Sequence, residues 1–321
     1  MVSLAHGKAR VELAPEVGGA IAEFAFAGVD VLRPTAPQAR TAGDVRAHAC
    51  YPLVPYSNRI ANARLAVAGH TAELARNFGD HPNPIHGVGW QRAWRVVRHD
   101  DRSALFALEH GAKGADAEAW PWPFRATQWF GLVAHEGGAT LTVKLALVNT
   151  GAIPFPFGLG LHPYFPRTAS TELDFDVDGV WENDATLLPI RCIGIPPEWR
   201  HELTGLPSRS ALRYSPLGRP GGLMAARRED TIDNVFTEWK GVAMLTDPAR
   251  PFDTGIAADR AAGFVVVYAP VARDFVAVEP VTHMTDAFNR AARGETGTGT
   301  RILAGATGFS CTIRIFARER P

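Results

Sequence analysis

One glutamate of this chain stands inside an otherwise apolar segment: Glu279, in the stretch FVAVEP at residues 275–280. Moving an ionised carboxylate out of water is costly unless a partner compensates its charge. Glu279 therefore either forms a structural ion pair with an arginine, or lies in an apolar pocket that raises its pKa and suits it to proton transfer. The residue type alone leaves both roles open.

Two histidines have unusual neighbours. His162 follows an apolar, glycine-interrupted run, and Pro163 after it predicts that a strand ends there, where side chains meet a cleft. His86 stands in a loop rich in proline and glycine, NPIHG at residues 83–87. Imidazoles exchange protons near neutral pH, so with the carboxylate they indicate acid–base catalysis without a cofactor. A core role for His162 and a surface role for His86 are the alternatives.

Polar residues in two further segments are candidates for binding. Asn58 and Arg59 lie in YPLVPYSNRI at residues 51–60, whose two prolines predict a rigid loop that presents hydrogen-bond donors. Asp233 begins an Asp-Asn pair between apolar residues. The alternatives are local bonding of the arginine to loop carbonyls and a turn at the Asp-Asn pair.

Composition excludes several classes of function. The 321 residues are 46% hydrophobic, enough for a large core, and 33 basic and 33 acidic residues give no net charge. We therefore expect no long-range electrostatic field that would attract nucleic acid or an anionic membrane. The three cysteines are far apart and form no C-x-x-C pair, which argues against a zinc site or a disulfide framework.

Sequence motifs give no sign of nucleotide binding or of a membrane. The chain has neither a Walker-type phosphate loop nor a G-x-G-x-x-G fingerprint. It also has no apolar N-terminal signal segment and no run approaching the ~18 apolar residues of a membrane span. We therefore expect a cytoplasmic protein.

Short segments rich in β-branched and aromatic residues dominate the chain and predict strands. The clearest cover residues 94–98, 104–108, 125–134, 139–148, 172–178, 263–268 and 309–317. The turn-rich stretch 135–138 predicts a hairpin, and residues 140–149, alternating at first and then continuously apolar, predict a strand that enters the core. Short helices are expected at 114–119 and 286–292. With no repeat and no linker, residues 1–321 predict one all-β domain, a barrel or a sandwich of several sheets.

Five ordered motifs resemble the aldose 1-epimerase (galactose mutarotase) family. They are SNRIANAR at residues 57–64, IHG at 85–87, HPYF at 162–165, DNVF at 233–236 and the strand that carries Glu279. They follow the family's order, and the resemblance covers nearly the whole chain.

The resemblance implies a galactose mutarotase-like β-supersandwich of large antiparallel sheets with few short helices. It implies interconversion of the α and β anomers of a free aldohexose without metal or cofactor, by a monomer or homodimer. Glu279 resembles the catalytic base and His162 the catalytic acid. The family's substrate-binding residues match Arg59, His86, Asp233 and Asn58.

Departures from the family pattern leave the preferred sugar open. The segment after Glu279 lacks the glutamine usual in the galactose-specific branch and carries His283 instead, which would add an imidazole near the site. Three other functions remain open alternatives: a non-catalytic sugar-binding or sensor protein, a metal-dependent enzyme and a hexose-6-phosphate epimerase. The second would use His86, His162, His283 and Glu279 as ligands. The third needs a cationic cluster, for which the candidates are Arg59, Arg92 and Arg95.

Overall fold

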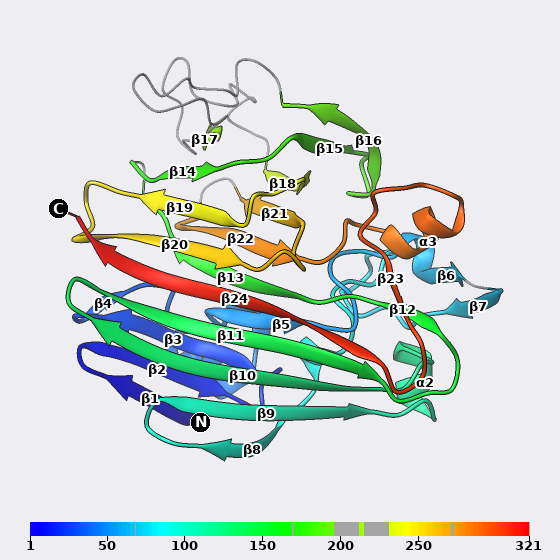
Figure 1. Ribbon diagram of the computed structural model, residues 1–321, viewed down its shortest axis with the longest axis horizontal. Helices are drawn as coiled ribbons and strands as arrows, with labels where there is room; N and C mark the ends of the chain where they lie inside the picture. The colour runs from blue at the N-terminus through cyan, green and yellow to red at the C-terminus, as the bar shows by residue number, and fades with distance from the viewer. Residues whose placement is uncertain (68, 169, 196–211, 215–230, 271–272, 321) are drawn as a thin grey trace.

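Two large sheets make up most of the protein. A computed structural model of the chain describes residues 1–67, 69–168, 170–195, 212–214, 231–270 and 273–320. Strands of both sheets run across the view in Figure 1. Every ladder between the strands described is antiparallel, so the expected all-β, galactose mutarotase-like architecture is confirmed.

The first sheet has eleven strands and the second has nine. In spatial order the first contains β1 (Val2–His6), β2 (Ala9–Ala14), β3 (Ala20–Phe26), β5 (Cys50–Leu53), β13 (Gly160–Pro166), β22 (Phe275–Val281), β21 (Phe264–Ala269), β18 (Ile232–Thr237), β15 (Gly179–Asn183) and β16 (Pro189–Gly194), with β4 (Val29–Asp30) paired to β3. The second contains β17 (Leu212–Tyr214), β14 (Glu172–Phe175), β19 (Val242–Thr246), β20 (Phe252–Ala258), β24 (Gly308–Glu319), β11 (Gly138–Asn149), β10 (Phe124–His135), β9 (Ser103–His110) and β8 (Arg95–His99).

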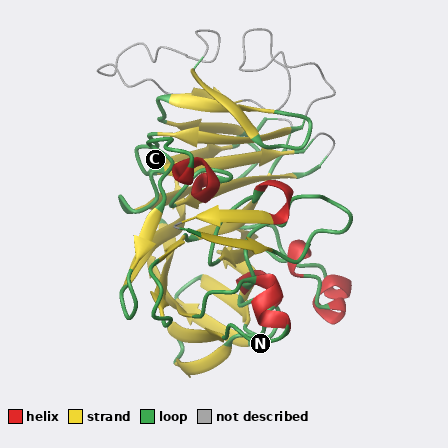
Figure 2. Ribbon diagram, turned by 90° about the vertical axis from the view of Figure 1, so that its right-hand side faces the viewer, coloured by secondary structure: helices red, strands yellow, loops and turns green. Residues whose placement is uncertain are grey.

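Short elements gather at one end of the sheets. Two small ladders join β6 (Arg64–Val67) to β7 (His70–Glu73) and β12 (Phe155–Phe157) to β23 (Arg301–Leu303). The helices are α1 (Pro37–Ala42), α2 (Ala115–Ala119), α3 (Ala287–Ala292) and the 3-10 turns η1 (Val45–Ala47), η2 (Ala61–Ala63) and η3 (Gly89–Gln91). Figure 2 looks at the end that carries α2 and α3. The helices α2 and α3 were predicted from the sequence and are confirmed. The helix α1 was not predicted. In the described residues, none of the helices combines the length and the apolar content needed to span a bilayer.

The hairpin of β10 and β11 forms as the sequence predicts. Its register pairs His135 with Gly138, and Gly137 in the turn has a φ of 75°, a backbone conformation that glycine adopts without strain. Side chains of β11 alternate between buried and exposed to the end of the strand, and Val148 is exposed. The predicted strand is confirmed: one of its faces carries Leu141, Val143, Leu145 and Leu147 into the core, whereas the other face is not fully covered.

Polar and aromatic contacts join the two sheets. Gln128 on β10 is buried and donates from Nε2 to the carbonyl oxygen of Gly19, at the start of β3, over 2.8 Å. A Cβ at Gly19 would lie 2.8 Å from the ring of Trp94, so glycine there allows the turn before β3 to approach the indole closely. Large buried aromatic side chains fill the core around this contact, among them Phe24, Phe106, Phe124 and Phe130. Each contributes roughly 1.5–3 kcal/mol by its burial.

One correction concerns the strand that carries His162. Pro163 does not end it: β13 continues to Pro166, and Pro163 pairs with Cys50 of β5. On the other side, the ladder with β22 is absent between Gly160 and Tyr164. Because proline lacks the N–H that a ladder uses, Pro163 locally interrupts backbone pairing with β22 and leaves the strand intact.

Gly87, next to His86, offers a test of how tightly the loops around the sheet are packed. Its φ is 68°, and an added Cβ would lie 2.4 Å from the carbonyl oxygen of Val54. Gly28 has a φ of 79° but no atom within 4 Å of such a Cβ. Gly28→Ala should cost about 1–2 kcal/mol for its backbone conformation, and Gly87→Ala about 1–3 kcal/mol more because backbone must move. Urea unfolding of both variants measures the difference, and equal losses would contradict the packing described.

Candidate active site

Strand register brings several polar side chains to one face of the first sheet. In antiparallel strands, directly opposed residues point to the same face. Asp233 on β18 lies opposite Tyr268 on β21, which lies opposite Ala277 on β22, which lies opposite Tyr164 on β13. Glu279, two residues beyond Ala277, therefore shares this face.

The opposite face of the same strands is apolar. Val276 and Val278 alternate with Ala277 and Glu279 along β22, and both valines belong to the hydrophobic core. The segment FVAVEP thus has one face in the core and the other at the floor of a cleft. Its apolar appearance in the sequence arises because the cleft floor is itself almost fully buried.

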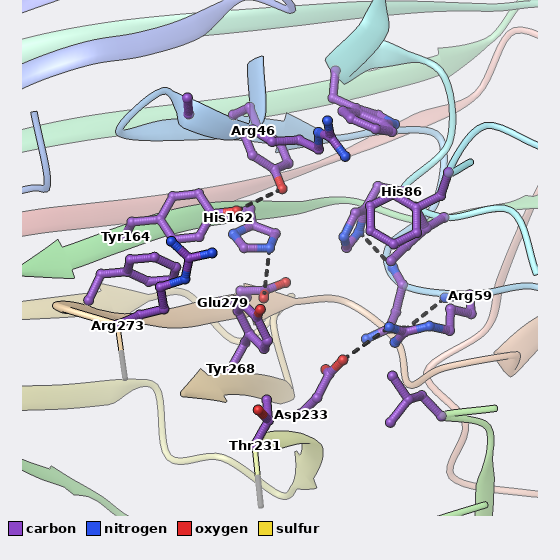
Figure 3. A pocket seen from close by; sticks show the side chains of 18 of the residues that line it. Arg46, Arg59, His86, His162, Tyr164, Thr231, Asp233, Tyr268, Arg273 and Glu279 are labelled. Carbon is purple, nitrogen blue, oxygen red and sulfur yellow. Dashed lines mark hydrogen bonds and ion pairs between the residues drawn. The ribbon is translucent and has the colours of Figure 1, made fainter. Parts of the chain in front are cut away.

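A contact between His162 and Glu279 forms the centre of this face. The registers of Gly160 with Val281 and of Tyr164 with Ala277 place the two residues opposite each other. Nε2 of His162 lies 3.1 Å from Oε1 of Glu279, and the side chains are 7% and 3% exposed. Figure 3 shows the contact in the middle of the pocket. Among the described residues, Oε2 of Glu279 and Nδ1 of His162 are buried and have no hydrogen-bond partner.

Burial shifts both of these groups toward their uncharged forms. The pKa of Glu279 is raised well above its ordinary value, first by burial and then by the charge of Asp233, while Arg59 opposes the rise. The pKa of His162 is lowered to about 3, mainly by burial, with a contribution from the charge of Arg33. Both shifts favour the state in which neither the carboxyl group nor the imidazole is charged.

His86 and Asn58 lock two loops together beside the pair. The N–H of Asn58 donates to Nδ1 of His86 over 3.0 Å, and the N–H of His86 donates to the carbonyl oxygen of Asn58 over 2.9 Å. Because Nδ1 accepts a hydrogen bond, the neutral ring carries its proton on Nε2. Burial, followed by the charges of His162 and Arg59, lowers the pKa of His86 well below its ordinary value. His86 is buried, so the prediction of a surface histidine is excluded.

Arg59 and Asp233 form an ion pair at one side of the cleft. Nη2 of Arg59 lies 3.0 Å from Oδ2 of Asp233, and Oδ1 of Asn58 accepts from both the N–H and Nη1 of Arg59. Asp233 lies in a strand, which excludes the turn considered for it. The six residues singled out in the sequence are thus close together, on three strands and two loops.

Aromatic residues that the sequence analysis did not single out form the walls of the pocket. The cavity has a volume of about 720 Å³ and opens to solvent, a size suited to a small ligand. The ring of Tyr51 lies 4.7 Å from that of His162 and stacks at 5.9 Å on Trp90. Tyr164, Tyr268 and Phe275 also line the pocket. Trp90 is the tryptophan among the lining residues.

Arginines line the pocket, but two of those predicted do not. Arg92 pairs with Asp116 at 2.9 Å, and Arg95 lies on β8, at the edge of the second sheet. Neither is among the lining residues of the pocket: Arg95 lies on the second sheet, and Arg92 follows η3 and pairs with Asp116. Arg33, Arg46 and Arg273 line it together with Arg59.

His283 does not reach the pocket. Its Nε2 accepts from the N–H of Ser57 over 3.1 Å, and its Nδ1 donates to the carbonyl oxygen of Met284 over 2.7 Å. Both ring nitrogens are thus engaged, so the predicted contribution of this imidazole to the site is wrong. The ligand atoms of His86, His162 and Glu279 lie within 4.8 Å of one another; these three are the groups that would hold a transition-metal ion, and His283 would not join them.

The aldose 1-epimerase family model matches residues 1–304 of the chain. The chain belongs to the aldose 1-epimerase family, whose members act on sugars by mutarotase-type chemistry.

Relatives from several organisms share the fold. The chain is 28% identical to the uncharacterized protein YphB of Escherichia coli K12, over 98% of this chain and 97% of the relative. A crystal structure of a candidate aldose 1-epimerase from the same organism superimposes with a TM-score of 0.80 and 25% identity, covering 99% of this chain and 98% of the other. A homologue of GalM and aldose epimerase from C. elegans, 17% identical, covers 99% of each chain with a TM-score of 0.77.

Titration of His283 should be visible in the stability of the protein. Burial lowers its pKa to about 4, whereas an unfolded chain keeps the ordinary value of about 6.5. Between these values only the unfolded chain takes up the proton, so this histidine makes the free energy of unfolding decrease as the pH falls. His283→Gln should remove up to about 1.4 kcal/mol per pH unit of that decrease. Urea unfolding from pH 7 to 4.5 measures the slope, with the exposed His99→Gln as control; an unchanged slope in His283→Gln would show that the ring is protonated when folded.

Proposed function

We propose that the protein is an aldose 1-epimerase that interconverts the α and β anomers of an aldohexose by general acid–base catalysis. The observation that carries the proposal is the buried contact of 3.1 Å between Nε2 of His162 and Oε1 of Glu279 at the floor of a cleft. Family membership makes sugar the substrate class, and the paired groups match the two proton transfers that the reaction needs.

Ring opening removes the proton of the anomeric hydroxyl and adds a proton to the ring oxygen as the bond between C1 and that oxygen breaks. The product is an open-chain aldehyde. Rotation about the C1–C2 bond and closure on the other face then give the second anomer, with both proton transfers reversed. One base and one acid suffice, and together they must carry one proton.

In this mechanism Glu279 is the base and His162 the acid. Burial favours the uncharged pair, with the proton on the carboxyl group. Transfer of that proton across the contact to His162 yields the carboxylate and imidazolium that face the two sugar oxygens. The free Oε2 of Glu279 and Nδ1 of His162 allow each group to turn toward substrate or to keep its contact.

Residues around the pair provide hydrogen bonds for the other hydroxyl groups. His86 offers a donor at Nε2, and the ion pair of Arg59 with Asp233 offers both donors and an acceptor. Asn58 orients Arg59 through its Oδ1. The rings of Tyr51 and Trp90 supply apolar surface against which C–H groups of a pyranose pack.

The two catalytic groups supply a useful acceleration without a metal. General acid or base assistance is worth about 10²–10⁴ per group. Two groups whose effects multiply would lower the barrier by roughly 5–11 kcal/mol. Polarimetry of freshly dissolved pure anomers, with and without the protein, tests the proposal; a sugar-binding protein without catalysis would bind the anomers and leave the rate unchanged.

Replacing Glu279 with Gln should lower kcat at least about 100-fold, because the amide keeps the shape of the side chain and cannot accept the proton. Thermal stability should be retained, since the variant removes a buried ionisable group. Polarimetry gives the rate and calorimetry the unfolding temperature. The exposed Glu136→Gln in the β10–β11 turn is the matched control, and near-normal turnover by Glu279→Gln would refute the role of the base.

Replacing His162 with Asn should also lower kcat at least about 100-fold, because the ring oxygen would lose its acid. The exposed His99→Asn serves as control. Saturation curves for both anomers separate kcat from KM. A loss confined to KM would assign His162 to sugar binding instead of proton transfer.

A further inference from the structure

Some of the arginines that line the pocket form an ion pair and others, among the described residues, do not. Four arginines line it. Arg46 pairs with Asp44 and Arg59 with Asp233. In the described part of the chain neither of the other two, Arg33 and Arg273, forms an ion pair with a carboxylate.

Arg33 is held in a fixed position. Its Nη2 donates to the carbonyl oxygens of Arg46 and His48 over 3.0 and 3.1 Å, and its guanidinium lies over the rings of Tyr164 and Phe275, 4.0 and 4.5 Å from their centres. The side chain is partly buried. The charge of Asp274 acts on Arg33 from a distance, but among the described residues no carboxylate forms an ion pair with it, and an anion that docks beside Arg33 would compensate its charge further.

These two arginines lie on one side of the catalytic pair. Tyr164, which Arg33 covers, has its ring centre 4.6 Å from that of His162. Figure 3 shows Arg273 on the side of the His162–Glu279 contact opposite to Arg59. Two arginines without an ion-paired carboxylate among the described residues therefore lie near His162, whereas the ion-paired Arg59 lies across the pocket.

We propose that the substrate is an aldose with an anionic group on C6, held by Arg33 and Arg273. The inference rests on the proposed function. The ring oxygen of an aldopyranose is bonded only to C1 and C5. When His162 faces that oxygen and Glu279 faces the hydroxyl on C1, the C6 group on C5 lies on the side of His162, where the two arginines are. Guanidinium groups bind both phosphate and carboxylate through paired hydrogen bonds.

Proton exchange NMR between the two anomeric signals tests this on glucose 6-phosphate, glucuronate, glucose and galactose. We expect kcat/KM for at least one anionic sugar to exceed that of glucose about 10- to 100-fold and to fall as salt is added. The better of the two anionic sugars identifies phosphate or carboxylate as the recognised group.

Arg273→Gln should reduce the ratio of kcat/KM for the preferred anionic sugar to that for glucose at least about tenfold. Arg273 is exposed, so the variant should fold, and the exposed Arg98→Gln on β8 is the matched control. Arg33→Lys, which keeps the charge but not the paired hydrogen bonds, should reduce the same ratio.

The outcomes separate this inference from the proposed function. Equal or faster turnover of glucose or galactose, or an unchanged ratio in Arg273→Gln, would overturn the anionic substrate and leave the mutarotase proposal in place. Acceleration of none of the four sugars would overturn both.

Discussion

The buried contact between His162 and Glu279 is the constraint on which the rest of the structure depends. Each group alone would be costly in so apolar a place, and each responds by favouring its uncharged form. In these uncharged forms the pair avoids the penalty of burying two separate charges. Its position is set by main-chain register and not by a flexible loop, so the two side chains face each other before any ligand arrives.

The two-sheet architecture explains why such a pair can be held. Behind the cleft, the valines of β22 pack into the core between the sheets, and this packing fixes the strand that carries Glu279. Beside it, β13 pairs with β5 through Pro163, and its pairing with β22 is interrupted between Gly160 and Tyr164. In front, the main chain of Asn58 bonds to both the ring and the main chain of His86. Strands thus position the buried His162–Glu279 pair, and two mutually bonded loops position His86, Asn58 and Arg59 beside it.

Electrostatics divides the pocket into two sides. On one side Arg59 is neutralised by Asp233, an arrangement that offers donors and acceptors to uncharged hydroxyl groups. On the other side Arg33 stacks on Tyr164 without a carboxylate partner among the described residues. The two arginines therefore differ in what holds them: a carboxylate pairs with Arg59, and aromatic rings pack against Arg33. Arg92 and Arg95 were candidates from the sequence for a cationic cluster. They do not line the pocket: Arg95 lies on the second sheet, and Arg92 pairs with Asp116.

By itself, the sequence determined the β-rich fold, the family and the identity of the six polar residues at the site. Those inferences needed only local patterns: alternation along strands, turn residues, and short motifs that follow the order of the family they resemble. Tertiary structure alone decided which of the other polar residues share the pocket. His283 does not line the pocket, although it comes only four positions after Glu279. Arg33 and Arg273, from distant segments, do line it. The reason is that cleft walls are made by contacts between strands and loops far apart in the chain, and spacing along the sequence carries no information about them.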